Sequence, residues 1–448
     1  MTTSSQNEKA SGSIVRIALV GNIANNFFRD GKALRESDSL DVHLYMRKND
    51  DTPNTELPES DEPCLAGNYP EWIHIFEDIN IKTVLLKHAG IHPSPDNNLQ
   101  KLIDELSRYD LCIFSGPELV ILPFVKTRTL FRATGSDLTV HPVFSYSEFY
   151  RARPGNKKIS IFHPFSKMLK VLRYYLRRYA YRKAIAEANF IDWCFGEPFK
   201  LAVEKLNIPK KKLINIFRLT IDQSVFKRST EATQKCNLRW AFESDDFLVF
   251  MPSRIMIRDT KLHRLTGQWK ASDVGIRGFK IFLDKLDDAD AQKAFLVIPE
   301  RTLSDDLAAA KQLVKELGLC GNVRFVSGDA EDGLTRHELI QFYSRVNAVF
   351  DDFGAGWFGS VVVEALSCEC PVITYVTEEM MQNMYGWHSL LIAKTAEDIR
   401  DRLLQLHRDP DLAEKIGKES RRWIQEFHSN AAVKQTLSAE LLKLATRP

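Results

Sequence analysis

The chain has 448 residues, of which 44% are hydrophobic, and its formal net charge is only +2. This length suits two or three domains with buried cores, and the small charge argues against nucleic acid as a partner. The seven cysteines are odd in number and lack metal-ligand spacing, so we expect reduced thiols and no metal site. The sequence begins without the apolar core of a signal peptide, and no apolar run approaches the ~20 residues of a membrane span.

Short apolar runs alternate with segments of helical periodicity along the whole chain. Continuous apolar strands separated by helices predict parallel sheets with helices on both faces. Two such series predict an α/β protein with two Rossmann-like, doubly wound domains that face a cleft. The expected strands lie near 15–20, 40–45, 111–115, 190–194 and 213–217, then near 247–251, 295–298, 323–326, 348–350 and 372–375, with helices near 99–106, 303–317, 338–346 and 396–406.

The loop after the first expected strand suits a ligand. Gly21 ends this strand, and Asn25 and Asn26 precede a helix expected to begin at about Phe27. Glycine lets the backbone approach a ligand, while asparagine can cap a helix and bind sugar hydroxyls. The G-x-G-x-x-G spacing of a dinucleotide site is absent. These residues are therefore expected to lie beside a bound ligand.

Residues 151–186 carry eleven basic residues and no acidic one. Two interpretations remain open. In one, the segment forms an ordinary helix whose apolar stripe lies in the core. In the other, it docks reversibly on an anionic membrane, at its cytoplasmic face, where interleaved tyrosines are favourable. The expected stripe consists of Phe165, Met168, Leu169, Leu172, Leu176 and Tyr179.

The stretch 351–373 is the most informative in the chain. A buried strand ends at its start, and a loop containing Gly356, Phe358 and Gly359 leads into apolar residues at helical spacing. Such a loop presents free backbone N–H groups and the positive end of a helix dipole, which suits a diphosphate. Glu364 lies within the helix, where its carboxylate can accept hydrogen bonds from a ribose diol. The pattern indicates a nucleotide-sugar site.

This stretch resembles the donor-site signature of family 4 glycosyltransferases, which are retaining enzymes of the two-domain GT-B class in the glycosyl transferases group 1 family. Their motif has two glutamates separated by seven residues, and Glu364 matches the second, which binds the ribose. Gly356 stands in place of the first, so the carboxylate that contacts the sugar is missing. The segment 208–226 resembles the family's interdomain passage, and residues 423–429 resemble its closing helix.

The resemblance also implies a pair of phosphate-binding cations in the second domain. Arg254 and Lys270 match the arginine and lysine that neutralise the leaving diphosphate, where electrostatic stabilisation of the transition state contributes most. The spacing is longer than usual, because residues 255–268 are inserted. Three cations of this insertion could take the lysine role instead: Arg258, Lys261 and Arg264.

Two further assignments rest on position, and the resemblance places Gly21, Asn25, Asn26 and Asp137 on the acceptor side of the reaction centre. Glu300 follows a strand and is expected to face the donor cleft, and Gly328 is expected beside the base pocket. The loop at 134–138 resembles the family's His-Gly-Ser/Thr-Asp loop, with Thr134 replacing the histidine. Asp137 in this loop could bind an acceptor hydroxyl, or it could form an Asx turn or helix cap.

The expected organisation is a disordered tail (1–13), an acceptor domain (14–220), a nucleotide-sugar domain (221–425) that begins with a polar linker at 227–244, and a crossover helix (426–448). The reduced cysteines favour a cytoplasmic location, and the resemblance implies a retaining glycosyltransferase that needs neither a metal nor another cofactor. It would move a sugar from a nucleotide-sugar to a glycan or lipid-linked acceptor in surface-polysaccharide assembly. Two alternatives remain: a nucleotide-sugar-binding protein without activity, or a nucleotide-sugar epimerase.

Overall fold

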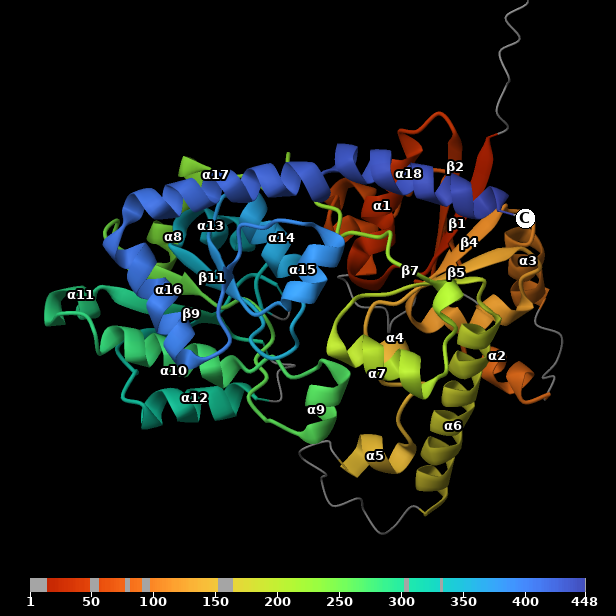
Figure 1. The fold of residues 1–448 in the computed structure, drawn as a ribbon, viewed down its shortest axis with the longest axis horizontal. Helices are drawn as coiled ribbons and strands as arrows, with labels where there is room; N and C mark the ends of the chain where they lie inside the picture. The colour runs from red at the N-terminus through yellow and green to blue at the C-terminus, as the bar shows by residue number, and fades with distance from the viewer. Residues whose placement is uncertain are drawn as a thin grey trace, which may run out of the picture.

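The computed structural model describes residues 14–48, 56–76, 81–90, 97–151, 164–301, 306–330 and 333–447. The tail expected at 1–13 lies outside them, as does part of the basic segment. The described residues form one sheet of seven strands and one of six, and each strand pairing within the sheets is parallel. The expected pair of Rossmann-like domains is therefore confirmed (Figure 1).

The first domain is built on a sheet of order β3-β2-β1-β4-β5-β6-β7. The strand order reverses between β1 and β4, so the crevice at the carboxyl ends of these strands is where a ligand is expected. Its strands are β1 (Val15–Val20), β2 (Leu40–Met46), β3 (Ile73–Ile75), β4 (Leu111–Phe114), β5 (Arg128–Arg132), β6 (Phe190–Asp192) and β7 (Leu213–Ile214). Its α-helices are α1 (Asn26–Arg35), α2 (Ile81–His88), α3 (Asn97–Leu106), α4 (Ser136–Thr139), α5 (Tyr146–Arg151), α6 (Pro164–Glu187) and α7 (Glu197–Lys205). Short 3-10 segments are η1 (Ile23–Asn25), η3 (Pro58–Ser60), η4 (Pro63–Leu65), η5 (Gly116–Phe124) and η6 (Lys210–Lys212).

The second domain has the sheet order β10-β9-β8-β11-β12-β13, which reverses between β8 and β11. The loops after β8 and β11 therefore lie at the position where ligands bind in such sheets. The strands are β8 (Phe247–Phe250), β9 (Ala294–Pro299), β10 (Val323–Val326), β11 (Ala348–Phe350), β12 (Val372–Thr374) and β13 (Leu391–Ile392). The helices are α8 (Thr230–Trp240), α9 (Lys261–Thr266), α10 (Ser272–Leu283), α11 (Asp288–Gln292), α12 (Leu307–Glu316), α13 (Arg336–Arg345), α14 (Ser360–Ser367), α15 (Glu378–Met384), α16 (Ala396–Arg408) and α17 (Pro410–Phe427).

Each expected strand appears, but the sequence reading missed β3, β5 and β13. Two of these lie at or near a sheet edge and have only two or three residues, and β5 carries an arginine at each end, which interrupts its apolar pattern. The prediction of a linker at 227–244 is wrong. Most of it is α8, which begins where the Ser229 hydroxyl accepts a hydrogen bond from the Ala232 amide.

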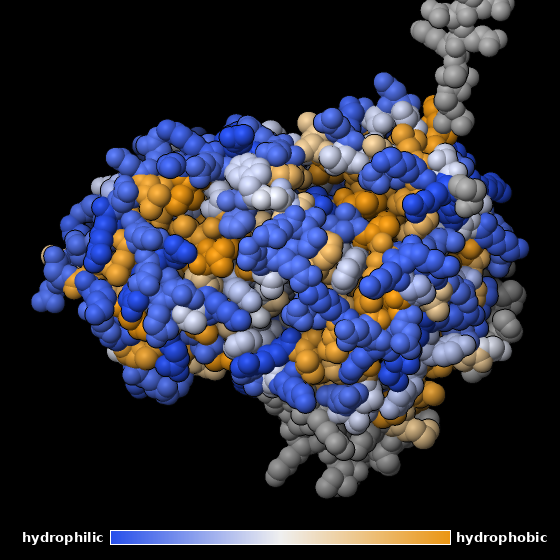
Figure 2. All heavy atoms as spheres, viewed as in Figure 1, coloured by the Kyte–Doolittle hydropathy of each residue, from blue (hydrophilic) through white to orange (hydrophobic). Residues whose placement is uncertain are grey.

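The last two helices join the domains. Figure 1 shows α17 running along the second domain and α18 (Asn430–Thr446) continuing along the first. Val433, Leu437 and Leu441 of α18 pack in the same hydrophobic cluster as strand β1. The chain crosses between the domains twice, and the two crossings touch, because Ile221 forms a parallel bridge with Ser429. On the face drawn in Figure 2, hydrophilic residues cover most of both domains and hydrophobic residues show in separate patches.

Candidate active site

A cavity of about 330 Å³ lies between the two domains. Its walls come from the carboxyl ends of strands in both sheets, as expected for a ligand site in doubly wound domains. From the second domain the lining includes Arg254, Gln268, Lys270, Asp352, Trp357, Phe358, Gly359 and Ser360. From the first domain and the crossing it includes Asn26, Arg132, Thr134, Asp192, Trp193, Asn215, Phe217 and Arg218.

Arg254 is a cation without an acidic partner. It follows β8, its side chain is exposed, and its Nη2 atom lies 3.6 Å from the Met256 sulfur. No carboxylate of the described residues forms an ion pair with it. A guanidinium that lines a cavity and has no counter-ion can bind an anionic group of a ligand without first losing another partner.

Lys270 lines the same cavity but is already paired. Its Nζ atom lies 3.5 Å from Asp352 Oδ2 and 3.9 Å from Asp351 Oδ1. Burial lowers the pKa of Lys270, but the two carboxylates outweigh burial, and the net shift is upward. Lys270 is therefore charged, and part of its charge is neutralised by Asp351 and Asp352, which are themselves buried.

The three alternatives to Lys270 lie elsewhere. Arg258 pairs with Asp306 at 2.8 Å, and Arg264 pairs with Asp259. Lys261 is exposed at the start of α9, and none of the three lines the cavity.

The loop between β11 and α14 is fixed by its own backbone contacts. The Oδ1 atom of Asp352 accepts hydrogen bonds from the amides of Gly354, at 2.8 Å, and Ala355, at 2.7 Å. Gly356 has φ +76°, and an added Cβ would lie 3.0 Å from a methyl carbon of Thr377. A glutamate at position 356 would be strained in this conformation.

The N-terminus of α14 opens into the cavity. Gly359 precedes the helix, and a Cβ added to it would meet no atom within 4 Å. Gly359 and Ser360 both line the cavity, next in sequence to Phe358, whose ring packs on Trp423. The first N–H groups of a helix lack intrahelical acceptors and carry the positive end of the dipole. This helix end and Arg254 line the same cavity, and each suits a phosphate group.

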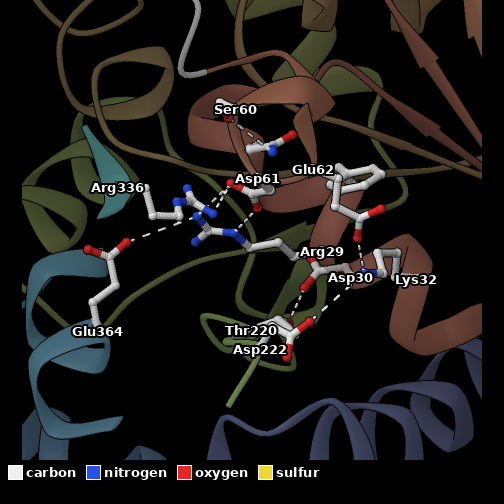
Figure 3. Close-up of polar contacts among 12 residues, drawn as sticks. Arg29, Asp30, Lys32, Ser60, Asp61, Glu62, Thr220, Asp222, Arg336 and Glu364 are labelled. Carbon is white, nitrogen blue, oxygen red and sulfur yellow. Dashed lines mark hydrogen bonds and ion pairs between the residues drawn. The ribbon is translucent and has the colours of Figure 1, made fainter. Parts of the chain in front are cut away.

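Glu364 lies in an ion-pair network away from the cavity lining. Its Oε2 atom accepts a hydrogen bond from the Tyr343 hydroxyl at 3.3 Å. Its Oε1 atom lies 4.0 Å from Arg29 Nη2 (Figure 3). Arg29 comes from α1 of the first domain. Burial raises the pKa of the Glu364 carboxyl, although Arg29 and Arg336 act in the opposite direction. Glu364, the residue expected to bind the ribose, is thus covered by Arg29 of the first domain.

Asp61 is the centre of this network. It accepts a hydrogen bond from Arg29 Nε at 2.6 Å and also pairs with Arg336, the first residue of α13 (Figure 3). Burial raises the pKa of Asp61, but the hydrogen bond from Arg29 and the charge of Arg336 outweigh it, so the pKa is lowered overall. Because Arg336 belongs to the second domain, the Asp61 carboxylate links the two domains.

The two residues assigned by position to the donor cleft do not line the cavity. Glu300 pairs with Lys311, and its Oε2 atom accepts a hydrogen bond from the Ser327 hydroxyl at 3.1 Å. Gly328 packs against the buried Glu338, whose carboxylate an added Cβ would approach to 2.6 Å. Both residues have local structural roles in the loops after β9 and β10.

On the acceptor side, only part of the expected set reaches the cavity. Asn26 lines it, whereas Asn25 is buried and Gly21 packs against the Ser115 carbonyl. Asp137 is also buried, and its carboxylate accepts hydrogen bonds from the backbone amides of its own loop, including Gly135 at 3.0 Å. The turn interpretation of Asp137 therefore describes its contacts better than the acceptor-binding one.

Sequence reading missed several cavity residues contributed by the first domain and the crossing. Asp192 ends β6 and accepts hydrogen bonds from the amides of Ile216, at 2.7 Å, and Phe217, at 3.3 Å. Burial raises the pKa of Asp192 to about 6. Arg218 donates to the Met384 carbonyl of the second domain at 3.1 Å. The sequence feature that could have indicated Asp192 as a cavity residue is its position at the end of an apolar strand.

Comparison with known families adds a decisive observation. Residues 272–423, which run from the start of α10 to α17, match the family model of glycosyl transferases group 1. The second domain is a group 1 glycosyl transferase domain. The match includes the β11–α14 loop and Glu364, and it confirms the resemblance seen in that stretch. Among curated protein sequences, none matches this chain.

Solved glycosyltransferase structures share the whole fold. HepE from Anabaena, in complex with UDP and glucose, has 13% identity and a TM-score of 0.61, with 96% of this chain and 100% of that chain covered. Sucrose-phosphate synthase from Thermosynechococcus elongatus has 15% identity and a TM-score of 0.59, with 96% and 99% covered. WaaG, a glycosyltransferase involved in lipopolysaccharide biosynthesis, has 11% identity and a TM-score of 0.52, with 96% and 100% covered. These similarities establish the GT-B fold for this chain.

Within the described residues, no helix combines the length and the apolar character that crossing a bilayer requires.

Proposed function

We propose that this chain is a retaining, metal-independent glycosyltransferase that moves a sugar from a nucleotide-sugar donor to a glycan or lipid-linked acceptor. The observation that carries the proposal is Arg254, a cation that lines the interdomain cavity without an acidic partner. The N-terminus of α14 opens into the same cavity. A guanidinium and a helix N-terminus facing one cavity suit the diphosphate of such a donor.

In the proposed reaction, the bond between the anomeric carbon and the diphosphate breaks. The oxygen of an acceptor hydroxyl bonds to that carbon on the same face, and the hydroxyl proton passes to the departing phosphate oxygen. Negative charge grows on the leaving diphosphate as this bond breaks. Arg254, assisted by the α14 dipole, stabilises that charge in the transition state, where such contacts raise the rate most. Lys270 contributes less, because Asp351 and Asp352 already neutralise part of its charge.

Glu364 is proposed to bind the donor ribose after a change in its surroundings. At 4.0 Å its contact with Arg29 is long for an ion pair, whereas Arg29 holds Asp61 at 2.6 Å. The ribose hydroxyls would replace Arg29 at the Glu364 carboxylate without breaking the Arg29–Asp61 pair. Glu364→Gln should then weaken donor binding while leaving the fold intact.

The donor is tested first by thermal shift with UDP-, ADP-, GDP- and dTDP-sugars. UDP-sugars head this series because HepE of the same fold binds UDP. A ligand present at 100 times its Kd adds ~2.7 kcal/mol of stability, enough for a clear shift. No shift with any sugar nucleotide would overturn the proposal.

Product analysis separates transfer from its alternatives. NMR of the product anomer tests retention, and activity in excess EDTA tests independence from metals. Conversion of the donor sugar without transfer would indicate an epimerase. Donor binding without turnover, across glycan and lipid-linked acceptors, would indicate a binding protein. We place the acceptor in surface-polysaccharide assembly, a role of the kind WaaG has in lipopolysaccharide biosynthesis.

A further inference from the structure

The N-terminal half of α6 exposes an apolar stripe. Met168, Leu172, Tyr175 and Tyr179 are 58%, 51%, 44% and 53% exposed, although each is a large hydrophobic residue. Their spacings of four, three and four residues place them on one face of the helix. In Figure 1 this half of α6 reaches beyond the rest of the first domain, beside α5. The stripe is therefore not part of the core.

The opposite face of α6 holds the helix in the domain. Ala180, Tyr181, Ala184 and Ile185 are buried in the first-domain core. Leu176, which the sequence pattern placed in the stripe, packs against this core instead. The helix is thus anchored through its C-terminal half, and its exposed stripe is held at a fixed orientation.

A basic hollow continues the same face. Arg182 and Ala186, three and seven residues after Tyr179, fall on the stripe's side of the helix and line a hollow of about 470 Å³. Lys205 and Lys212 line the hollow as well. None of its nine lining residues is acidic, and its remaining lining is largely apolar.

No acidic residue lines the hollow, although the Glu187 and Glu148 carboxylates lie close enough to act on Lys212 and Lys205. Burial lowers the pKa of Arg182, and the nearby Arg178 lowers it further. Burial and Lys211 likewise lower the pKa of Lys212, with Glu187 at the end of α6 acting in the opposite direction. The basic side chains of Arg182 and Lys212 bond to the backbone carbonyls of Pro142 and Ala186. An anionic group entering the hollow would relieve the repulsion among these cations.

We propose that this face of α6 docks on an anionic phospholipid bilayer. The stripe of Met168, Leu172, Tyr175 and Tyr179 enters the interface between headgroups and acyl chains, a position that suits tyrosine. The hollow formed with Lys205 and Lys212 receives a lipid phosphate. The charge complementarity of an acid-free basic hollow next to an apolar stripe selects an anionic bilayer over a neutral one.

Vesicle sedimentation tests this docking with the full-length protein and no donor, so the result is independent of the proposed transfer. Wild type should bind vesicles of phosphatidylglycerol and phosphatidylcholine much better than vesicles of phosphatidylcholine alone. Binding should weaken with salt, because the Debye length falls from ~10 Å at 0.1 M to ~3 Å at 1 M. Equal binding to both vesicle types, or to neither, would overturn the inference.

Two pairs of variants test the two parts of the surface. Lys205→Gln with Lys212→Gln should weaken binding about 25-fold, taking roughly fivefold for each cation near an anionic surface. The Arg substitutions at both positions should retain binding. The matched control, Lys285→Gln with Lys415→Gln, removes the same charge from exposed sites of the second domain and should bind like wild type.

Leu172→Glu tests the stripe, with Leu238→Glu as its control, because Leu238 is 85% exposed on α8 of the other domain. The Leu172 variant should lose most vesicle binding while keeping the wild-type melting temperature, and the Leu238 variant should lose little. If the Leu172 variant and the lysine pair both bind like wild type, the surface is not a membrane-docking site. Binding of glycerol phosphate without binding of vesicles would also refute docking.

Discussion

Replacing Arg254 by alanine should weaken the binding of a nucleoside diphosphate and leave the protein otherwise unchanged. Arg254 is exposed and has no acidic partner, so its removal leaves no buried charge unpaired. The unliganded variant should therefore melt at the wild-type temperature. In this respect Arg254 differs from most charged residues of the interdomain region, which form ion pairs with one another.

The expected loss of affinity follows from one charge-assisted contact. A hydrogen bond to a charged group contributes about 1.5–3 kcal/mol, and tenfold in affinity corresponds to about 1.4 kcal/mol. Since Arg254 is exposed, water will replace part of the contact, and the lower end of this range applies. The diphosphate should bind about tenfold more weakly to the variant, while the nucleoside without phosphates should bind as it does to wild type.

Isothermal titration calorimetry measures both affinities directly. The diphosphate that gives the largest thermal shift is compared with its own nucleoside, in wild type and in the variant. Arg277→Ala is the control, because Arg277 is an exposed arginine of the same domain that does not line the cavity. Unchanged diphosphate affinity in the Arg254 variant, or an equal loss for the nucleoside, would refute the assignment.

Three further outcomes are expected. Lys270→Met should lower the free energy of unfolding by about 3 kcal/mol, because it leaves the buried Asp351 and Asp352 without a cation. Denaturant titration measures this change, and an unchanged unfolding midpoint would contradict the pairing. Asp192→Asn should remove a pH dependence of stability. Burial raises the pKa of Asp192 from its ordinary value of 3.8 to about 6. The folded state therefore binds the proton more tightly, which stabilises it fully below pH 3.8. This stabilisation is lost as the pH rises through 6. The variant, followed by melting temperature, should lack that decline between pH 4 and 6, and an identical profile would count against the raised pKa. Gly356→Ala should cost about 1–2 kcal/mol, because its φ of +76° is unfavourable for a side chain; an equal melting temperature would show that the loop relaxes.

Local patterns in the sequence were sufficient for the fold. The strands are continuous apolar runs because both faces of a parallel sheet are covered, and such runs are visible without tertiary information. The glycine-containing loop before α14 was also recognisable from the sequence, because its conformation depends on glycines that are close together in the chain. Arg254 could be placed because a residue directly after a strand of a doubly wound sheet lies at its ligand-binding edge.

The sequence pattern was misleading where a local feature has more than one structural use. The polar residues at 227–244 suit a linker as well as a surface helix, and only packing against α13 shows that they contain α8. Asp137 suits a ligand or a turn equally well. In the structure its carboxylate accepts hydrogen bonds from the amides of its own loop.

The sequence by itself determined that this chain has two Rossmann-like domains and a glycine-containing loop before α14, because both depend on residues close together in the chain. Only the tertiary structure decided what Glu364 contacts, since its partner Arg29 belongs to the other domain and is far away in sequence. It also decided that the stripe on α6 is exposed. The periodicity of a helix shows which residues share a face, but whether that face is covered depends on which elements pack against it.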